Sequence, residues 1–217
     1  MANNEYGVYL VTEGDLSADR STVAIVEAAI RGGVDVVQLR EKETSARERY
    51  QLGKRLRELT SEHGVPLIVN DRIDLARAID ADGVHIGDDD LPIHVARDQL
   101  GEDAIIGRSV STPAAAREAE AVGADYLGVG AIYRTDSKDT DPEYTEIGPE
   151  AVREIRDAVE IPFVGIGGIT PENAAGVVSA GADGVAVVSA ITAADDPEEA
   201  TRKLGEAVEN ARRAVDV

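Results

Sequence analysis

The chain has 217 residues, a formal net charge of −20 at pH 7 and no cysteine. This length fits one large domain or two small ones. The lack of thiols excludes disulfides, thiolate metal sites and cysteine nucleophiles, and the acidity argues against a basic nucleic-acid-binding face. No apolar run approaches the ~20 residues of a transmembrane helix. The start, MANNEYGVYL, lacks the features of a signal peptide, so we expect a cytoplasmic protein.

The cationic side chains are nearly all arginines. Only four of the 22 are lysines, namely Lys42, Lys54, Lys138 and Lys203. High acidity with few lysines suggests a cytoplasm rich in salt, because ions screen the repulsion between surface carboxylates over a few ångström. We therefore hypothesise a halophilic habitat.

Apolar runs typical of buried strands alternate with amphipathic segments along the chain. Strands are expected at residues 6–12, 34–39, 65–69, 83–86, 104–110, 125–132, 161–166 and 184–189. Helices are expected at residues 21–30, 45–63, 73–80, 92–100, 112–122, 149–159, 170–180 and 196–215. Glycines or cap-and-proline pairs mark several of the helix ends. The polar segment 133–146 is expected to be a functional loop.

Eight strand–helix pairs in unbroken succession predict a single (β/α)₈ TIM barrel over residues 1–217, rather than an open sheet. An internal sequence repeat supports this prediction. A small-residue stop, an aspartate and an apolar run recur in GGVDVVQL (32–39), DADGVHIG (80–87), VGADYLGVG (122–130) and AGADGVAVV (180–188). Every second unit thus carries the same helix-to-strand turn, as expected for a repeated two-strand unit.

Carboxylates follow two successive strands, at the end of a barrel that normally carries the chemistry. Asp71 follows the third expected strand, and Asp88, Asp89 and Asp90 follow the fourth. Mg²⁺ is commonly held by one or two carboxylates together with substrate phosphates and water. We therefore predict a Mg²⁺ site formed by Asp71 and one of the three later aspartates.

Cationic residues also gather at the strand ends, although the protein is acidic. They are Arg40, Lys42, Arg72, Arg108, Arg134 and Lys138. Gln38, Arg40 and Lys42 alternate along the second strand, so they share the side expected to face the barrel interior. Gly167 and Gly168 precede a helix and offer backbone N–H groups to a second anion. Two anion sites on one rim suggest a condensation of two phosphorylated ligands.

The motifs of this rim resemble, in order and over nearly the whole chain, those of the thiamine-phosphate synthase family. They are residues 38–42, 70–72, 82–90, 107–109, 135–138 and 165–170. Departures from the family pattern are Asp88 for a common Gln, Arg134 for Pro, Ser137 for Thr and Ser111 for His. The resemblance implies a TIM barrel that uses Mg²⁺ to join hydroxymethylpyrimidine diphosphate to thiazole phosphate, with release of diphosphate.

The resemblance also implies roles for single residues. Asp71 and Asp90 would hold Mg²⁺. The pyrimidine diphosphate would contact Gln38, Leu39, Arg40, Glu41, Lys42, Asn70, Ser109 and Lys138, and the thiazole phosphate would contact Thr135, Asp136, Ser137, Gly168, Val188 and Ser189. Arg40, Lys42, Lys138 and Ser109 are the expected catalytic residues, since positive charge would stabilise the departing diphosphate. The thiazole nitrogen is the nucleophile, so no protein nucleophile is required.

Several alternatives stay open at this point. The barrel could be a thiazole tautomerase or a non-catalytic protein that binds a phosphorylated ligand. Asp71 could form a structural ion pair with Arg72, and Glu41 could serve to orient Arg40. His85 is expected to be a hydrogen-bonded core histidine, and His63 and His94 are expected on the surface. A homo-oligomer is allowed, and the sequence leaves open whether the thiazole carries a carboxylate.

Overall fold

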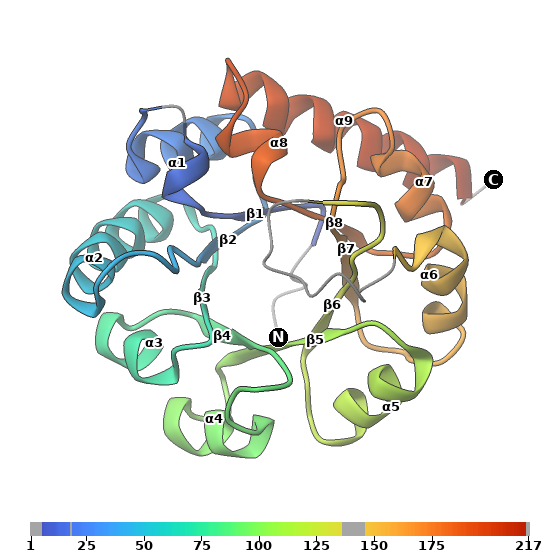
Figure 1. Cartoon of the computed structure of the whole chain (residues 1–217), viewed down its shortest axis with the longest axis horizontal. Coiled ribbons are helices and arrows are strands. Elements are labelled where there is room, and N and C mark those ends of the chain that lie inside the picture. The colour runs from blue at the N-terminus through green and yellow to red at the C-terminus, as the bar shows by residue number, and fades with distance from the viewer. Residues whose placement is uncertain (1–5, 18, 136–145, 216–217) are drawn as a thin grey trace.

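A computed structural model describes residues 6–17, 19–135 and 146–215 of the chain. Eight parallel strands form a closed barrel in sequence order, and β8 closes on β1. Figure 1 looks into this barrel and shows the helices as an outer ring. The predicted (β/α)₈ TIM barrel is confirmed. The strands are β1 (Val8–Val11), β2 (Val36–Leu39), β3 (Leu67–Asn70), β4 (Gly83–Ile86), β5 (Ile105–Val110), β6 (Tyr126–Val129), β7 (Phe163–Ile166) and β8 (Gly184–Val187).

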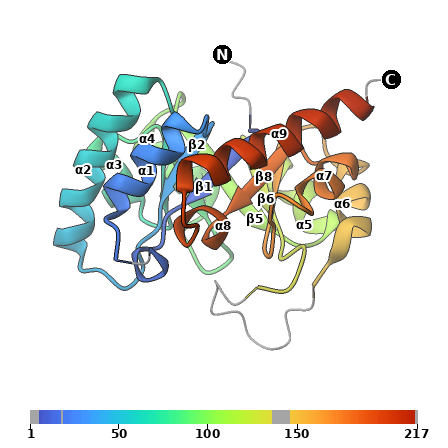
Figure 2. The same ribbon diagram turned by 90° about the horizontal axis from the view of Figure 1, so that it is seen from above.

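The helices follow the predicted order with two additions, a 3₁₀ turn after β1 and a short helix after β8. They are η1 (Gly14–Leu16), α1 (Thr22–Arg31), α2 (Ala46–His63), α3 (Ile73–Ile79), α4 (Ile93–Leu100), α5 (Pro113–Ala121), α6 (Gly148–Arg156), α7 (Ala174–Ser179), α8 (Ser189–Thr192) and α9 (Pro197–Val215). The side view in Figure 2 shows α8 at one end of the barrel and α9 running along its side. None of the described helices combines the length and hydrophobicity needed to cross a membrane.

Side-chain caps mark the starts of α1, α2 and α5. Ser45 and Glu48 form a capping box at the start of α2, and Gly64 ends this helix in a left-handed conformation with φ 69°. The predicted start of the seventh helix at Thr170 is wrong. The Asn173 side chain accepts a hydrogen bond from the Thr170 N–H at 2.8 Å and donates one to the Gly168 carbonyl at 3.0 Å. This turn delays α7 to Ala174.

Alternation along the short strands divides the apolar residues into two sets. One set lies between the strands and the helices, and it includes Leu10, Val37 and Leu39. The other set fills the barrel interior and consists of Tyr6, Tyr9, Val11, Val36, Ile68, Tyr126, Val164 and Ala186. Large aromatic side chains therefore occupy the middle of the barrel, so it is a packed core and not an open pore.

The internal sequence repeat has a structural cause at the amino-terminal end of the barrel. The aspartate that precedes each even-numbered strand accepts a backbone N–H of the preceding odd-numbered strand. The pairs are Asp35 with Val8, Asp82 with Leu67, Asp125 with Ile106 and Asp183 with Phe163, at 2.7–2.9 Å. Arg57, Arg97 and Arg156 make ion pairs with the last three of these aspartates. Each repeated turn thus ties two strands together.

We expect Asp125→Ala to lower the free energy of unfolding by about 1–3 kcal/mol, because the buried Ile106 N–H loses its acceptor and Arg97 loses its ion-pair partner. Asp125→Asn keeps an acceptor oxygen and should cost less. Chemical denaturation at one fixed KCl concentration measures the differences. Asp98→Ala, which removes an exposed carboxylate of α4, is the control. An equal loss in Asp98→Ala and Asp125→Ala would contradict the interpretation.

Candidate active site at the carboxyl ends of the strands

Two carboxylates from neighbouring strands meet at the carboxyl end of the barrel. Asp71 follows β3 in a left-handed conformation with φ 61°, and its N–H donates to the His85 carbonyl of β4 at 2.8 Å. Asp90 closes the turn after β4, and its Oδ2 accepts the Gly87 N–H at 2.6 Å. Burial, together with the neighbouring Asp71 carboxylate, raises the pKa of Asp90. The structure therefore brings together the two aspartates that the resemblance pairs.

This pair is a donor set that suits a hard cation. Lys42 Nζ lies 3.4 Å from Asp71 Oδ2, and its side chain is half-exposed. Over the described ranges, no group of three or more His, Cys, Asp or Glu residues could hold a metal ion. A divalent cation at Asp71 and Asp90 would therefore take further oxygen ligands from a substrate phosphate or from water, which is the usual behaviour of Mg²⁺.

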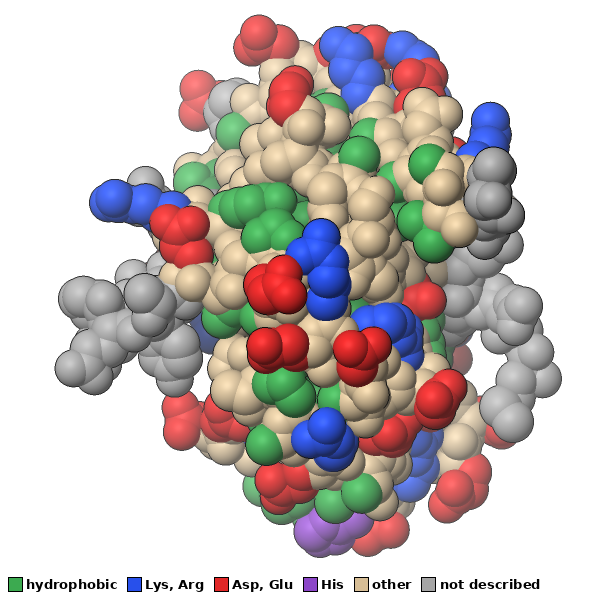
Figure 3. Space-filling view, turned by 90° about the vertical axis from the view of Figure 1, so that its right-hand side faces the viewer, with side chains coloured by type: hydrophobic (Ala, Val, Ile, Leu, Met, Phe, Trp, Pro, Cys, Tyr) green, Lys and Arg blue, Asp and Glu red, His purple; other side chains and the backbone are tan. Residues whose placement is uncertain are grey.

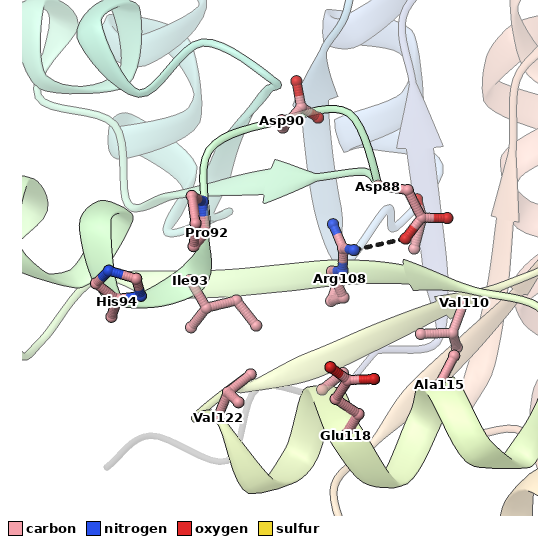
Figure 4. A pocket seen from close by; sticks show the side chains of 12 residues that line it. Asp88, Asp90, Pro92, Ile93, His94, Arg108, Val110, Ala115, Glu118 and Val122 are labelled. Atoms are coloured by element: carbon pink, nitrogen blue, oxygen red, sulfur yellow. Dashed lines mark hydrogen bonds and ion pairs between the residues drawn. The ribbon is translucent and has the colours of Figure 1, made fainter.

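Asp88 has a different role. Its Oδ1 accepts a hydrogen bond from Arg108 at 2.5 Å, and Arg108 also donates to the Gly87 carbonyl. Arg108 lies in a groove between α4 and α5, as Figure 4 shows, and this groove has a volume of about 400 Å³. Arg108 therefore contacts the rim turn after β4, but alternation along β5 directs its side chain toward the helices and away from the barrel interior.

Two other predicted cations are also paired. Arg40 is buried and forms an ion pair with Glu13. Burial raises the pKa of Glu13, although the adjacent Arg40 acts in the opposite direction. Arg72 binds Asp74 at 2.5 Å, so the alternative of an Asp71–Arg72 pair is wrong. Among the described residues, Lys42 is therefore the cation that accompanies the carboxylate pair, while Arg134 is exposed beyond β6.

The side chains of residues 38–42, at the end of β2, lie in different environments. Leu39 is fully buried in the core under the helices, so a contact of Leu39 with a ligand would use its backbone. Glu41 accepts hydrogen bonds from the Gly14 N–H and the Thr22 hydroxyl, both at 2.9 Å. The expectation that Glu41 orients Arg40 is wrong, since its carboxylate holds the connection between β1 and α1.

A chain of polar side chains crosses the barrel interior. Gln38 Nε2 donates to the Tyr9 hydroxyl at 2.7 Å, and Tyr9 meets the Tyr126 hydroxyl at 2.7 Å. Tyr126 lies 3.0 Å from His85 Nδ1, and His85 Nε2 lies 2.9 Å from Ser109 Oγ. The prediction of a hydrogen-bonded core His85 is confirmed, as is the exposure of His63 and His94. Sequence reasoning missed the two tyrosines, although alternation along their strands places them inside.

The opposite side of the rim contains those predicted thiazole-phosphate residues that the structure describes, namely Thr135, Gly168, Val188 and Ser189. The N–H of Tyr133 donates to the Gly167 carbonyl at 3.0 Å, which brings the segment leading to Thr135 against the end of β7. Gly168 has φ +62°, and a Cβ there would lie 2.4 Å from the Arg134 carbonyl oxygen. Val188 and Ser189 follow β8 and begin α8. Asp136, Ser137 and Lys138 lie outside the described residues.

A closed parallel barrel with carboxylates, a lysine and glycine turns at its strand ends has the architecture of a TIM-barrel enzyme. The sequence model of the family described as thiamine monophosphate synthase matches residues 8–191. A thiamine-phosphate synthase of Natronomonas pharaonis is 73% identical over 94% of this chain and 96% of that protein. One of Haloarcula marismortui is 63% identical over 96% of this chain and 99% of that protein.

A solved structure agrees with these relatives. The thiamine phosphate pyrophosphorylase from Pyrococcus furiosus superimposes with a TM-score of 0.86 at 42% identity, covering 96% of this chain and 98% of that one. The chain belongs to the thiamine monophosphate synthase family. As a member of this family it is a transferase that forms thiamine phosphate.

We expect Asp90→Asn to make the metal-free protein more stable at neutral pH. Because the pKa of Asp90 is raised in the folded state, that state holds the proton more tightly than the unfolded chain does. The wild type therefore loses stability as the pH rises through this pKa, whereas the neutral amide does not. Thermal unfolding with a chelator, at constant KCl and from acidic to neutral pH, measures the difference.

The advantage of Asp90→Asn should shrink as the pH falls below the pKa of Asp90. Asp89→Asn is the matched control, because Asp89 is an exposed carboxylate of the same turn. If Asp90→Asn and the wild type had the same unfolding temperature at neutral pH, the Asp90 carboxylate beside Asp71 would not destabilise the folded protein.

Proposed function

We propose that the protein condenses hydroxymethylpyrimidine diphosphate with 4-methyl-5-(2-phosphoethyl)thiazole, or its carboxylate, to give thiamine phosphate and diphosphate. One observation carries the proposal: Asp71 and Asp90 meet beside Lys42 at the carboxyl end of the barrel. Membership of the thiamine monophosphate synthase family supports it. A ligand that carries a diphosphate would place its negative charge at this carboxylate pair, bridged by a divalent cation.

The reaction breaks the bond between the pyrimidine methylene carbon and the diphosphate oxygen, and it forms a bond from that carbon to the thiazole nitrogen. Mg²⁺ held by Asp71 and Asp90 would supply Lewis acidity toward the departing diphosphate. Lys42 lies where its ammonium group can stabilise the same charge. Arg40 would also stabilise this negative charge once it leaves its ion pair with Glu13 and binds the diphosphate.

The pyrimidine ring would sit over the interior residues Gln38 and Ser109, with Asn70 at the end of β3 beside them. Asn70 is in register with His85, so these residues occupy neighbouring strand ends. The thiazole phosphate would be held at Gly168, Val188 and Ser189 with Thr135. On the resemblance alone, we extend this set to Asp136 and Ser137, and we add Lys138 to the residues that contact the pyrimidine diphosphate. We also propose that the protein works in the cytoplasm.

We expect diphosphate release from the two substrates to require both Mg²⁺ and Asp71. Asp71→Asn removes one of two protein ligands and should slow the reaction by roughly 10²-fold or more, a typical cost of losing transition-state charge stabilisation. Coupled assays of diphosphate and thiamine phosphate at high KCl measure the rates, with Asp89→Asn as the control. Tight Mg²⁺-independent binding of thiazole phosphate without diphosphate release would instead favour a thiazole tautomerase or a non-catalytic binding barrel.

We also propose a salt-rich working environment. The net charge is −20, and Figure 3 shows carboxylates spread over the face that it presents. Because added ions screen their mutual repulsion, we expect the unfolding temperature to rise from low to molar KCl. Thermal unfolding over a KCl series measures this dependence. Equal or greater stability at low salt would contradict the proposal.

A further inference from the structure

The buried polar chain consists of Gln38, Tyr9, Tyr126, His85 and Ser109, and it links five strands. Its two ends, Gln38 and Ser109, belong to the proposed pyrimidine site. Its three middle residues, on β1, β6 and β4, have no role in the proposed reaction. Ser109 is only partly buried, whereas Tyr9 and Tyr126 are almost completely buried. The middle of the chain thus lies in the closed core, and Ser109 lies nearer the opening of the barrel.

The number of hydrogen atoms on each group determines which group donates in each hydrogen bond of this chain. The described residues give the Tyr9 oxygen two partners, and one of them, Gln38 Nε2, donates to it. If Tyr126 also donated to Tyr9, the Tyr9 proton would be buried without an acceptor, which is unfavourable. Tyr9 therefore donates to Tyr126. The single proton of Tyr126 is then directed to the other neighbour of its hydroxyl, His85 Nδ1.

The direction continues through the imidazole to the rim. With Nδ1 accepting, neutral His85 carries its proton on Nε2 and donates it to Ser109 Oγ at 2.9 Å. The Ser109 hydroxyl is then left with its own proton to donate elsewhere. At the other end, one N–H of the Gln38 amide donates to Tyr9, which directs the amide nitrogen toward Tyr9 and leaves the carbonyl oxygen to accept from a ligand.

Two features hold this arrangement in place. Burial raises the pKa of both tyrosines, so each remains a phenol that can donate. The His85 ring lies in a slot between two glycines of β5 and β6. A Cβ at Gly107 would lie 2.5 Å from His85 Nδ1, and one at Gly128 would lie 2.9 Å from His85 Cε1. The ring fits because these two positions carry no side chain.

We propose that Tyr9, Tyr126 and His85 are positioning residues that fix Ser109 as a hydrogen-bond donor and Gln38 as an acceptor toward the ligand. An aminopyrimidine presents a ring nitrogen that accepts and an exocyclic amino group that donates, and it therefore matches this pair. The ligand assignment rests on the proposed function, whereas the tautomer of His85 does not. A ligand with the reversed pattern would leave buried polar groups unpaired, which is a strong basis for rejection.

The first test measures the tautomer directly by NMR of protein labelled with ¹⁵N-histidine, without substrates. His85 is expected to carry its proton on Nε2, and the exposed His63 and His94 serve as internal references. Tyr126→Phe removes the hydrogen bond to Nδ1, so the ¹⁵N chemical shift of Nδ1 should move toward that of an imidazole nitrogen without a donor. Either an Nδ1–H tautomer in the wild type or an unchanged Nδ1 shift in Tyr126→Phe would overturn the proposal.

The second test measures binding of the pyrimidine diphosphate and of inorganic diphosphate by calorimetry with Mg²⁺. Tyr126→Phe should weaken binding of the pyrimidine diphosphate by about tenfold, the value of one hydrogen bond. It should leave the affinity for inorganic diphosphate unchanged, because that ligand has no pyrimidine. Tyr6→Phe is the control, since Tyr6 stacks on Tyr126 in the same cluster and is not one of the five residues.

Equal weakening of both ligands would indicate general damage and would overturn the proposal. Tyr9→Phe provides a second variant in case Tyr126→Phe fails to fold, and it should produce the same selective loss. If wild-type protein binds inorganic diphosphate but not the pyrimidine diphosphate, the proposed function is wrong. The NMR result would then still decide whether His85 is held in one tautomer.

Discussion

Closure of eight short parallel strands is the constraint on which the site depends, because it assigns every strand residue to the interior or to the helices. Gln38, His85 and Ser109 face inward and form one hydrogen-bonded chain with two tyrosines. Leu39 and Arg108, each next to one of them in sequence, face the helices instead. A single residue of register shift would exchange these roles, so the precision of the barrel decides the chemistry at its rim.

The two ends of the barrel use the same residue type for opposite purposes. Aspartates such as Asp125 accept a backbone N–H and meet an arginine, so their charge is satisfied within the protein. At the other end Asp71 and Asp90 face each other, and burial with mutual repulsion raises the pKa of Asp90. Carboxylates that are paired with donors thus stabilise the amino-terminal end of the barrel. The arrangement that suits a cation lies at the carboxyl end.

The fold was predictable because each strand and helix leaves a local pattern, and the repeated aspartate marked every second turn. A pair of Asp71 with one of Asp88, Asp89 and Asp90 could also be anticipated, since successive parallel strands end on the same rim, and the family resemblance singled out Asp90. The partners of charged residues could not be predicted. Arg40 meets Glu13 and Arg72 meets Asp74, and such pairings depend on side-chain geometry rather than on position along a strand. The Tyr9–Tyr126 contact joins residues 117 apart in sequence, and a local pattern carries no signal for it.

The ion pairs of the rim bear on how an acidic protein could hold two phosphorylated ligands. Arg40, Arg72 and Arg108 each already pair with a carboxylate, so a ligand would have to displace that partner before using the arginine. Lys42 also pairs with a carboxylate, but that carboxylate is Asp71 of the proposed cation site, and the Lys42 side chain is half-exposed. With so little unpaired positive charge available from these side chains, binding of a diphosphate would depend strongly on a cation between Asp71 and Asp90. The uncharged hydrogen-bonded chain in the barrel interior would then recognise the pyrimidine ring and not the charge of the diphosphate.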